Sequence, residues 1–223
     1  LSWTGLMNEI LVLAHELGHA GHFQLAKKQS ILNYEPSLYF IEAPSTANEV
    51  LTCNTLLKQN QDPGFQAYLI SELISRTYFH NMVTHLLEAA FQREVYTRFD
   101  KDEYLNGDIL CQIKLDLIKE FWGPDFEIGE DAGLIWMRQP HYYMGLYPYT
   151  YSAGLTIGTA MAKQLEEKPE QVVETWLETL SLGASLSAQD LAKHAGIDVS
   201  TDQPLKETIA YVGSLVDKLQ TLL

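Results

Sequence analysis

The sequence has few cysteines, few basic residues and no long apolar run. Its only cysteines, Cys53 and Cys111, are too few for a disulfide framework and fit a reducing compartment, so we expect a cytoplasmic protein. No apolar run approaches ~20 residues, and we therefore expect no segment that spans a bilayer. Lysine and arginine number 15 against 29 aspartates and glutamates, a formal net charge of -14, and form no basic block. Because nucleic acids and anionic membranes attract positive surfaces, we expect neither as a partner.

The first ten residues, LSWTGLMNEI, lack an initiator methionine, a charged n-region and a signal-peptide pattern. The strand-like LSWTG leads directly into a helical segment, and nothing before it supports that segment. We therefore expect the sequence to be the C-terminal fragment of a longer polypeptide, whose missing N-terminal portion is expected to be its partner.

Helical periodicity dominates the sequence, whose 223 residues are 46% hydrophobic and can bury a sizeable core. Residues 65–99 contain neither proline nor glycine, which predicts one long helix or two helices joined by a kink. The segment 124–148 is rich in glycine, proline and aromatic residues and has no clear periodicity. Further helices are predicted near residues 6–25, 40–59, 106–122, 152–167, 169–183, 187–196 and 204–223. The sequence thus predicts a single, mostly α-helical domain over residues 1–223, with a short N-terminal strand.

The stretch LVLAHELGHAGHF, which begins at Leu11, places three histidines and a glutamate in otherwise apolar, helix-favouring sequence. Residues four apart lie on one face of a helix, so His15 and His19 can both direct a ring nitrogen at one zinc ion. Glu16 is rotated off that axis and can reach a water at the metal as a general base, which is the H-E-x-x-H arrangement. Gly18 is expected to leave room beside the metal. This short pattern also recurs by chance, but ionisable groups in an apolar helix need a partner, which favours one zinc ion per chain.

A catalytic zinc usually has three protein ligands, and the third is less obvious. His22 lies on the same stripe, but a single straight helix does not easily wrap a third ligand around the ion. The metzincin pattern is excluded because it requires glycine at position 22 and histidine at position 25. Glu42, at or just before the start of the next helix, is the better candidate; that helix begins near Glu42 or has Ser45 as its N-cap. Glu49 is predicted either to orient a ligand histidine or to be a solvated helix charge.

The segment HYYMGLYPYTY, residues 141–151, is nearly half tyrosine. Tyrosine clusters often fill cores, but Gly145 and Pro148 should keep this stretch from forming a regular helix, and irregular segments on a rigid scaffold often carry function. A phenol or imidazole group aimed at the oxyanion of peptide hydrolysis would stabilise that charge. The last three tyrosines share a face only if the backbone is extended. The candidates are His141 and Tyr149 as catalytic residues, with Tyr147 and Tyr151 as substrate-binding residues.

Three other histidines, His80, His85 and His194, are expected to be packed or surface residues rather than ligands. Cys53 lacks the cationic neighbours in sequence that would indicate an activated thiolate, so we expect a small buried apolar residue.

Three separated motifs, HELGHAGH, FIEAPSTANE and PHYYMGLYPYTYSAG, occur in this order. Together they resemble the oligoendopeptidase F branch of the thimet oligopeptidase family of zinc metallopeptidases, over essentially the whole chain. The resemblance implies a multi-helix, zincin-like catalytic domain in which His15, His19 and Glu42 are the zinc ligands and Glu16 is the catalytic base. It also implies that residues 141–151 lie over the active site. Family members are much longer and have an N-terminal helical portion that closes over a deep substrate channel, which implies selection for short peptides.

We therefore expect a zinc-dependent endopeptidase that hydrolyses oligopeptides. One rival is a zinc metallocarboxypeptidase of related helical fold, in which Arg138, close to His141 in sequence, could bind the terminal carboxylate of the substrate. A second rival is a non-catalytic fragment that binds zinc or peptide without turnover. Peptides with free and amidated C-termini distinguish the first rival, and bound zinc without hydrolysis would indicate the second.

Overall fold

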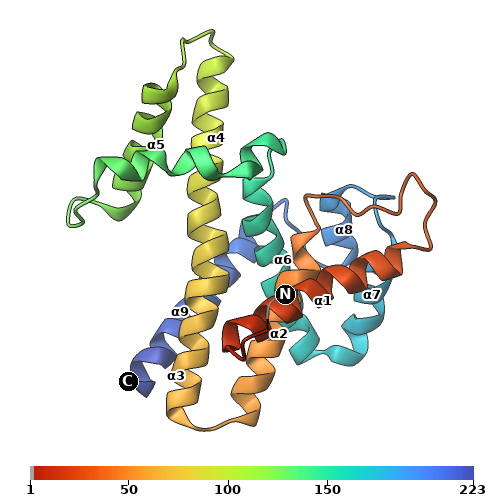
Figure 1. Ribbon diagram of the computed structural model, residues 1–223. Helices are drawn as coiled ribbons and strands as arrows, with labels where there is room; N and C mark the ends of the chain where they lie inside the picture. The colour runs from red at the N-terminus through yellow and green to blue at the C-terminus, as the bar shows by residue number, and fades with distance from the viewer. Residues whose placement is uncertain (1–2) are drawn as a thin grey trace. The chain divides into compact units, whose positions relative to one another are not determined.

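The computed structural model describes residues 3–223, and every regular element in this range is helical (Figure 1). The mostly α-helical prediction is therefore confirmed. The expected N-terminal strand is absent from the described residues, because residues 3–6 have no regular structure; Leu1 and Ser2 lie outside the described part. No described helix is both long and apolar enough to cross a membrane.

The chain forms two compact units. The first comprises the residues up to Asn81 and Thr150–Leu223, and the second is Met82–Tyr149. The first unit contains α1 (Met7–Ala26), α2 (Glu42–Gln59), α3 (Pro63–Glu72), α7 (Pro169–Ser181), α8 (Ala188–His194) and α9 (Gln203–Leu222), with most of the π-helical segment η1 (Leu73–Thr84) and of α6 (Pro148–Glu167). The second contains α4 (His85–Phe99), α5 (Gly107–Trp122) and two 3-10 segments, η2 (Glu130–Arg138) and η3 (Pro140–Tyr143).

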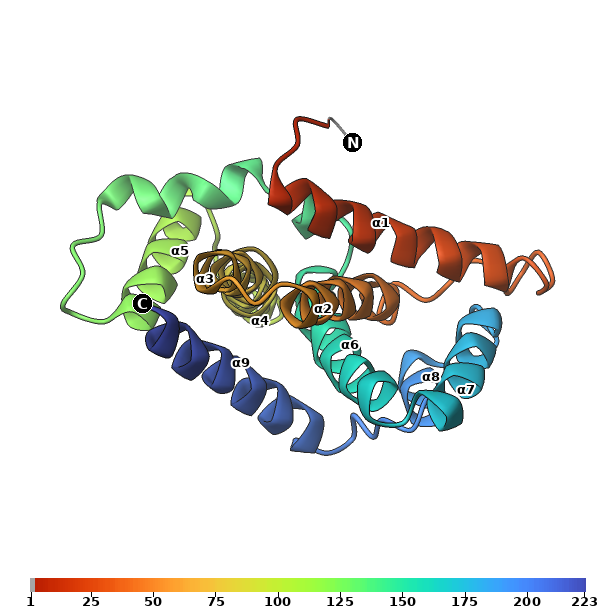
Figure 2. The same ribbon diagram turned by 90° about the horizontal axis from the view of Figure 1, so that it is seen from below.

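Helix α2 lies against both α1 and α6, and glycine makes each approach close (Figure 2). A Cβ added at Gly18 of α1 would lie 2.5 Å from the Cα of Ser45, and one added at Gly154 of α6 would lie 2.4 Å from the Cβ of Glu42. Gly158 meets α2 in the same way, because a Cβ there would lie 2.8 Å from the backbone nitrogen of Ala47. Gly18 was predicted to leave room beside a metal; its close neighbour is instead the backbone of α2, so it allows two helices to approach.

The core of the first unit excludes water from one side of α1. Phe40 and Met161 are fully buried there and pack with Trp176 and Leu191 in one apolar cluster. His22 is also fully buried, with its ring edge-on to that of Phe40 at 5.9 Å between centroids. Burial, helped by the nearby ring of His19, lowers the pKa of His22 to about 4. His22 is therefore neutral at pH 7 and packs as part of the core.

The long helical stretch predicted for residues 65–99 is continuous but not uniform. Asp62 caps α3 by accepting a hydrogen bond from the backbone of Phe65, with Pro63 in the first turn. The α-helical hydrogen bonding then gives way to π-helical bonding in η1, before α4 continues to Phe99. π-helical turns are often found at functional sites. Here the π-helical segment presents the fully buried Thr77 to α2.

In the second unit, α4 and α5 form an antiparallel hairpin (Figure 1). The side chain of Asn106 caps α5, and Gly123, with φ of 75°, ends it. The helix predicted near residues 106–122 is therefore confirmed. The 3-10 segment η2 packs directly on α5, because a Cβ at Gly133 would lie 2.6 Å from the carbonyl oxygen of Cys111.

The aromatic segment divides at Pro148. Residues 140–143 form a 3-10 turn, and Gly145 has φ of 70°, which L side chains rarely adopt. Pro148, predicted to prevent a helix, instead begins α6, where its missing N–H costs no hydrogen bond. Tyr149 and Tyr151 are therefore helical residues. Residues two apart share a face in extended backbone but not in a helix, so these two side chains do not share a face.

Candidate metal centre

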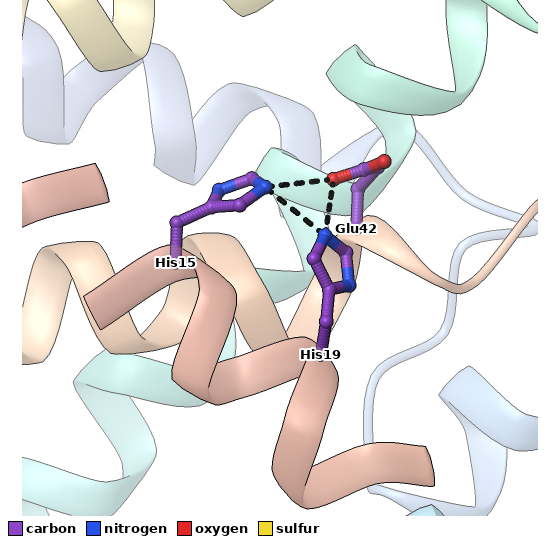
Figure 3. Close-up of side chains that lie close together, drawn as sticks. All are labelled: His15, His19 and Glu42. Atoms are coloured by element: carbon purple, nitrogen blue, oxygen red, sulfur yellow. Dashed lines mark hydrogen bonds and ion pairs between the residues drawn. The ribbon is translucent and has the colours of Figure 1, made fainter. Parts of the chain in front are cut away.

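Three side chains of the first unit converge on one point: His15 and His19 of α1 and Glu42 of α2 (Figure 3). The Nε2 atoms of the two histidines are 3.0 Å apart. Each of them lies 3.4 Å from Oε2 of Glu42. Glu42 is only 3% exposed, so its carboxylate faces the histidines rather than bulk water.

This donor set fits zinc. Ligand atoms at ~2.0–2.1 Å from a tetrahedral zinc ion lie about 3.3 Å from one another, which is close to the 3.0 and 3.4 Å separations in this cluster. The other ring nitrogen of His19, Nδ1, is buried without a hydrogen-bond partner, so no protein contact draws this ring away from the cluster. Two imidazoles and one carboxylate also leave a coordination position for water, as catalytic zinc sites do.

Local helix geometry positions each of the three side chains. His15 and His19 are one turn apart on α1, so their rings project from one face. Glu42 is in the first turn of α2, with Pro44 beside it, which agrees with the earlier of the two predicted starts of this helix. The hydroxyl of Ser45 is 3.2 Å from Oε2 of Glu42 and can donate a hydrogen bond to it.

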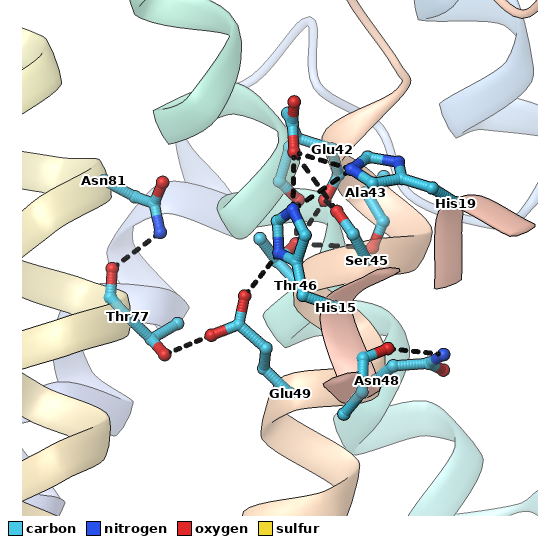
Figure 4. Close-up of polar contacts among 12 residues, drawn as sticks. His15, His19, Glu42, Ala43, Ser45, Thr46, Asn48, Glu49, Thr77 and Asn81 are labelled. Atoms are coloured by element: carbon cyan, nitrogen blue, oxygen red, sulfur yellow. Dashed lines mark hydrogen bonds and ion pairs between the residues drawn. The ribbon is translucent and has the colours of Figure 1, made fainter. Parts of the chain in front are cut away.

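Glu49 holds His15 from the side opposite Glu42 (Figure 4). Its Oε1 is 2.6 Å from Nδ1 of His15, and its Oε2 accepts a hydrogen bond from the hydroxyl of Thr77. Burial alone would lower the pKa of His15, but the hydrogen bond and charge of Glu49, together with Glu42 and Glu16, outweigh burial and raise it. A carboxylate bonded to Nδ1 fixes the tautomer that leaves Nε2 free for a metal.

The chain of contacts continues beyond Glu49. The amide nitrogen of the Asn81 side chain donates to the backbone carbonyl of Thr77 at 2.7 Å, and the Ser152 hydroxyl donates to the carbonyl of Asn81 at 2.6 Å. Thr77 and Asn81 both belong to η1. The sequence alternatives for Glu49 included a solvated helix charge, but in the structure it is 8% exposed and bonded at both oxygens.

Replacing Thr77 with Val should weaken zinc binding about tenfold, because Glu49 loses a donor and holds His15 less firmly. Valine keeps the volume of the side chain, whereas Thr77→Ser keeps the hydroxyl and should restore affinity. Competition with a zinc chelator measures the effect. Equal affinity of the Val and Ser variants would show that Thr77 does not position the ligand.

Glu16 lies one residue after His15 on α1 and is exposed. Its charge contributes to the raised pKa of His15, so the carboxylate is close to the cluster without belonging to it. His22, the other candidate third ligand in the sequence, is also outside the cluster. Its ring is packed against Phe40 instead.

The remaining predicted site residues are divided between the two units. His141, Tyr147 and Tyr149 belong to the second unit, and Tyr151 belongs to the first. Within the second unit, the rings of His141 and Tyr147 are in edge-on contact at 5.2 Å. The carbonyl of Gly145 accepts a hydrogen bond of 2.7 Å from the side chain of Gln92 on α4, which ties the aromatic segment to that helix.

The structure reveals a second cluster, of His85, Glu88 and His141, that sequence reasoning missed. His85 was expected to be packed or on the surface, and it is indeed buried, but it is hydrogen-bonded to Glu88. The spacing of His85 and Glu88, three residues apart in a helix, could have indicated a pair on one face. No sequence signal linked them to His141.

The helical fold, in which an H-E-x-x-H helix packs against a helix that carries a glutamate, belongs to the zincin-like class of peptidase folds. A model of peptidase family M3 matches residues 5–211, and the chain belongs to this family. The resemblance noted from the sequence is therefore confirmed.

Two curated relatives match most of the chain. Oligopeptidase PepF of Bacillus subtilis is 26% identical over 224 residues, covering 100% of this chain and 33% of the relative. An oligoendopeptidase F homolog of Borreliella burgdorferi is 26% identical over 208 residues, covering 91% of this chain and 34% of the relative. The chain spans about a third of the length of these relatives.

A solved structure shares the fold. The crystal structure of oligoendopeptidase-F from Enterococcus faecium superposes with a TM-score of 0.82 at 24% identity, covering 97% of this chain and 39% of that one.

Proposed function

We propose that the polypeptide containing this chain is a zinc-dependent endopeptidase that cleaves short peptides. The observation that carries the proposal is the convergence of His15, His19 and Glu42 on one point, in a chain of peptidase family M3. The names of its relatives, oligopeptidase and oligoendopeptidase, support oligopeptides as the substrate class. These three residues would hold the catalytic zinc ion.

In this proposal, Glu16 and Glu49 have different roles in the reaction. Zinc, when bound, polarises the scissile carbonyl and lowers the pKa of a water toward ~7. Glu16, exposed beside the cluster, takes a proton from the attacking water and delivers it to the leaving amine. Glu49 keeps His15 in the orientation and tautomer that a metal ligand requires.

The aromatic segment has the complementary role in the proposal. His141 and Tyr149 stabilise the oxyanion by donating hydrogen bonds, and Tyr147 and Tyr151 contact the peptide. This part rests on the resemblance of residues 141–151 to the corresponding family segment. Two contacts in the second unit support a fixed position for the segment: the hydrogen bond from Gln92 to Gly145 and the packing of His141 on Tyr147.

Metal removal tests this function. Dialysis of the polypeptide against a chelator should abolish cleavage of an internally quenched peptide, and added zinc should restore it. A His15→Ala/His19→Ala variant should stay inactive at the same zinc concentration, because it lacks two of three ligands. The substrate should be cleaved equally with a free or an amidated C-terminus, since an endopeptidase does not need the terminal carboxylate.

Three results would contradict the proposal. Full activity after chelation would exclude a required metal. Cleavage that depends on a free C-terminus would favour the metallocarboxypeptidase. Stoichiometric zinc in a protein that cleaves no peptide would favour a non-catalytic binding module.

A further inference from the structure

A second group of potential metal ligands lies in the second unit, on elements that the zinc-binding motif does not include. His85 and Glu88 are in the first turn of α4, three residues apart, and His141 is in η3. One ligand atom from each lies within 4.8 Å of the other two. His85 is 2% exposed and Glu88 is 6% exposed, so the group is largely shielded from water.

The contacts within this group direct its donor atoms at one another. Nδ1 of His85 is 2.7 Å from Oε2 of Glu88, and Nδ1 of His141 is 4.0 Å from the same oxygen. The rings of His85 and His141 lie 5.5 Å apart between centroids. Both imidazoles therefore lie beside one carboxylate oxygen, where a cation could replace the proton that His85 shares with Glu88.

The other oxygen of Glu88 is already held. The side-chain amide of Gln139 donates a hydrogen bond to Oε1, which leaves Oε2 for the histidines. Hydrogen bonds to a ligand carboxylate fix its orientation, as they do around known metal sites. Burial raises the pKa of Glu88, but the hydrogen bonds from His85 and Gln139 outweigh burial and lower it.

We propose that His85, Glu88 and His141 form a second divalent-metal site, selective for zinc-like ions that accept two imidazoles and one carboxylate. Its ligands come from the second unit alone. The inference shares His141 with the proposed peptidase function, but it concerns metal binding and is tested without turnover.

Lys114 of α5 is the feature that limits the affinity of this site. It is 3% exposed, its ammonium lies 5.8 Å from the centre of the Phe91 ring, and its charge acts on Glu88. A buried positive charge repels an incoming cation. We therefore expect this charge to weaken zinc binding at the second site.

Zinc binding in a variant without the first cluster tests the site. The polypeptide with His15→Ala/His19→Ala is dialysed against zinc chloride and its metal content is measured. About one zinc per chain should remain, and Glu88→Gln or His85→Ala added to this background should remove it. His80→Ala, a change at an exposed histidine outside both clusters, should have no effect. Absence of zinc from the background variant, or zinc that persists after the Glu88 and His85 changes, would overturn the proposal.

Lys114→Met gives a second measurement that does not remove a ligand. It replaces a buried cation with an apolar side chain of similar length, so the fold should be retained. Zinc affinity of the His15→Ala/His19→Ala background should rise by about tenfold, because one repulsive charge is lost from a shielded site. Unchanged or weaker zinc binding, in a variant with an unaltered thermal melting temperature, would contradict a metal site beside Glu88.

Discussion

Replacing Glu16 with Gln should reduce kcat/KM for a peptide substrate by about 10²–10⁴-fold and leave zinc affinity unchanged. Glutamine has nearly the same shape but cannot take a proton from the attacking water. Glu16 is outside the cluster of His15, His19 and Glu42, so the ligands themselves are untouched. The expected pattern is therefore loss of the chemical step without loss of metal. Steady-state kinetics and zinc titration of the same preparation measure both quantities.

The control for Glu16→Gln is Glu170→Gln. Glu170 is an exposed acid in the first turn of α7, so its replacement makes the same change of net charge outside the cluster. The control should retain full turnover. If the Glu16 variant also keeps its turnover, Glu16 is not the base. If it loses zinc as well as activity, its contribution is structural.

Much of the candidate centre could be predicted because it depends on short-range geometry. His15 and His19 are one helical turn apart, so they lie on one face of the helix whatever packs around it. The start of α2 near Glu42 is one of the two starts that the sequence predicts, because Pro44 is tolerated in a first turn. The direct bond between His15 and Glu49 was one of two alternatives in the sequence. Only the packing of α1 against α2 decides between them.

The parts that sequence could not predict depend on contacts between distant segments. Thr77 has no catalytic signature, and its contact with Glu49 follows from the π-helical turn of η1, which periodicity did not reveal. The sequence predicts only a catalytic role for His141. In the structure its side chain also lies beside His85 and Glu88, which belong to α4. The sequence predicts that Pro148 prevents a helix, but the structure places it in the first turn of α6, where proline is compatible with a helix.

Gly154→Ala should lower both the stability of the fold and the affinity for zinc. The added methyl group would lie 2.4 Å from the Cβ of Glu42 and 2.8 Å from its carbonyl carbon. These are atoms of the α2 backbone and the base of a ligand side chain, so neither can move without moving the carboxylate. Overpacking of this kind typically lowers the free energy of unfolding by about 1–3 kcal/mol. Alanine in place of glycine in a helix raises it by only about 0.5–1 kcal/mol, so the net effect is destabilising.

The effect on zinc follows from the proposed role of Glu42 as the third ligand. A displaced carboxylate no longer lies 3.4 Å from both histidine nitrogens, and loss of ligand orientation commonly weakens metal binding by about 10–100-fold. Zinc competition and thermal melting of the metal-free protein separate the two effects. Gly21→Ala is the matched control, because a Cβ there has no neighbour within 4 Å and should stabilise α1 slightly. Unchanged zinc affinity in the Gly154 variant would mean that Glu42 does not need its contact with α6 to act as a ligand.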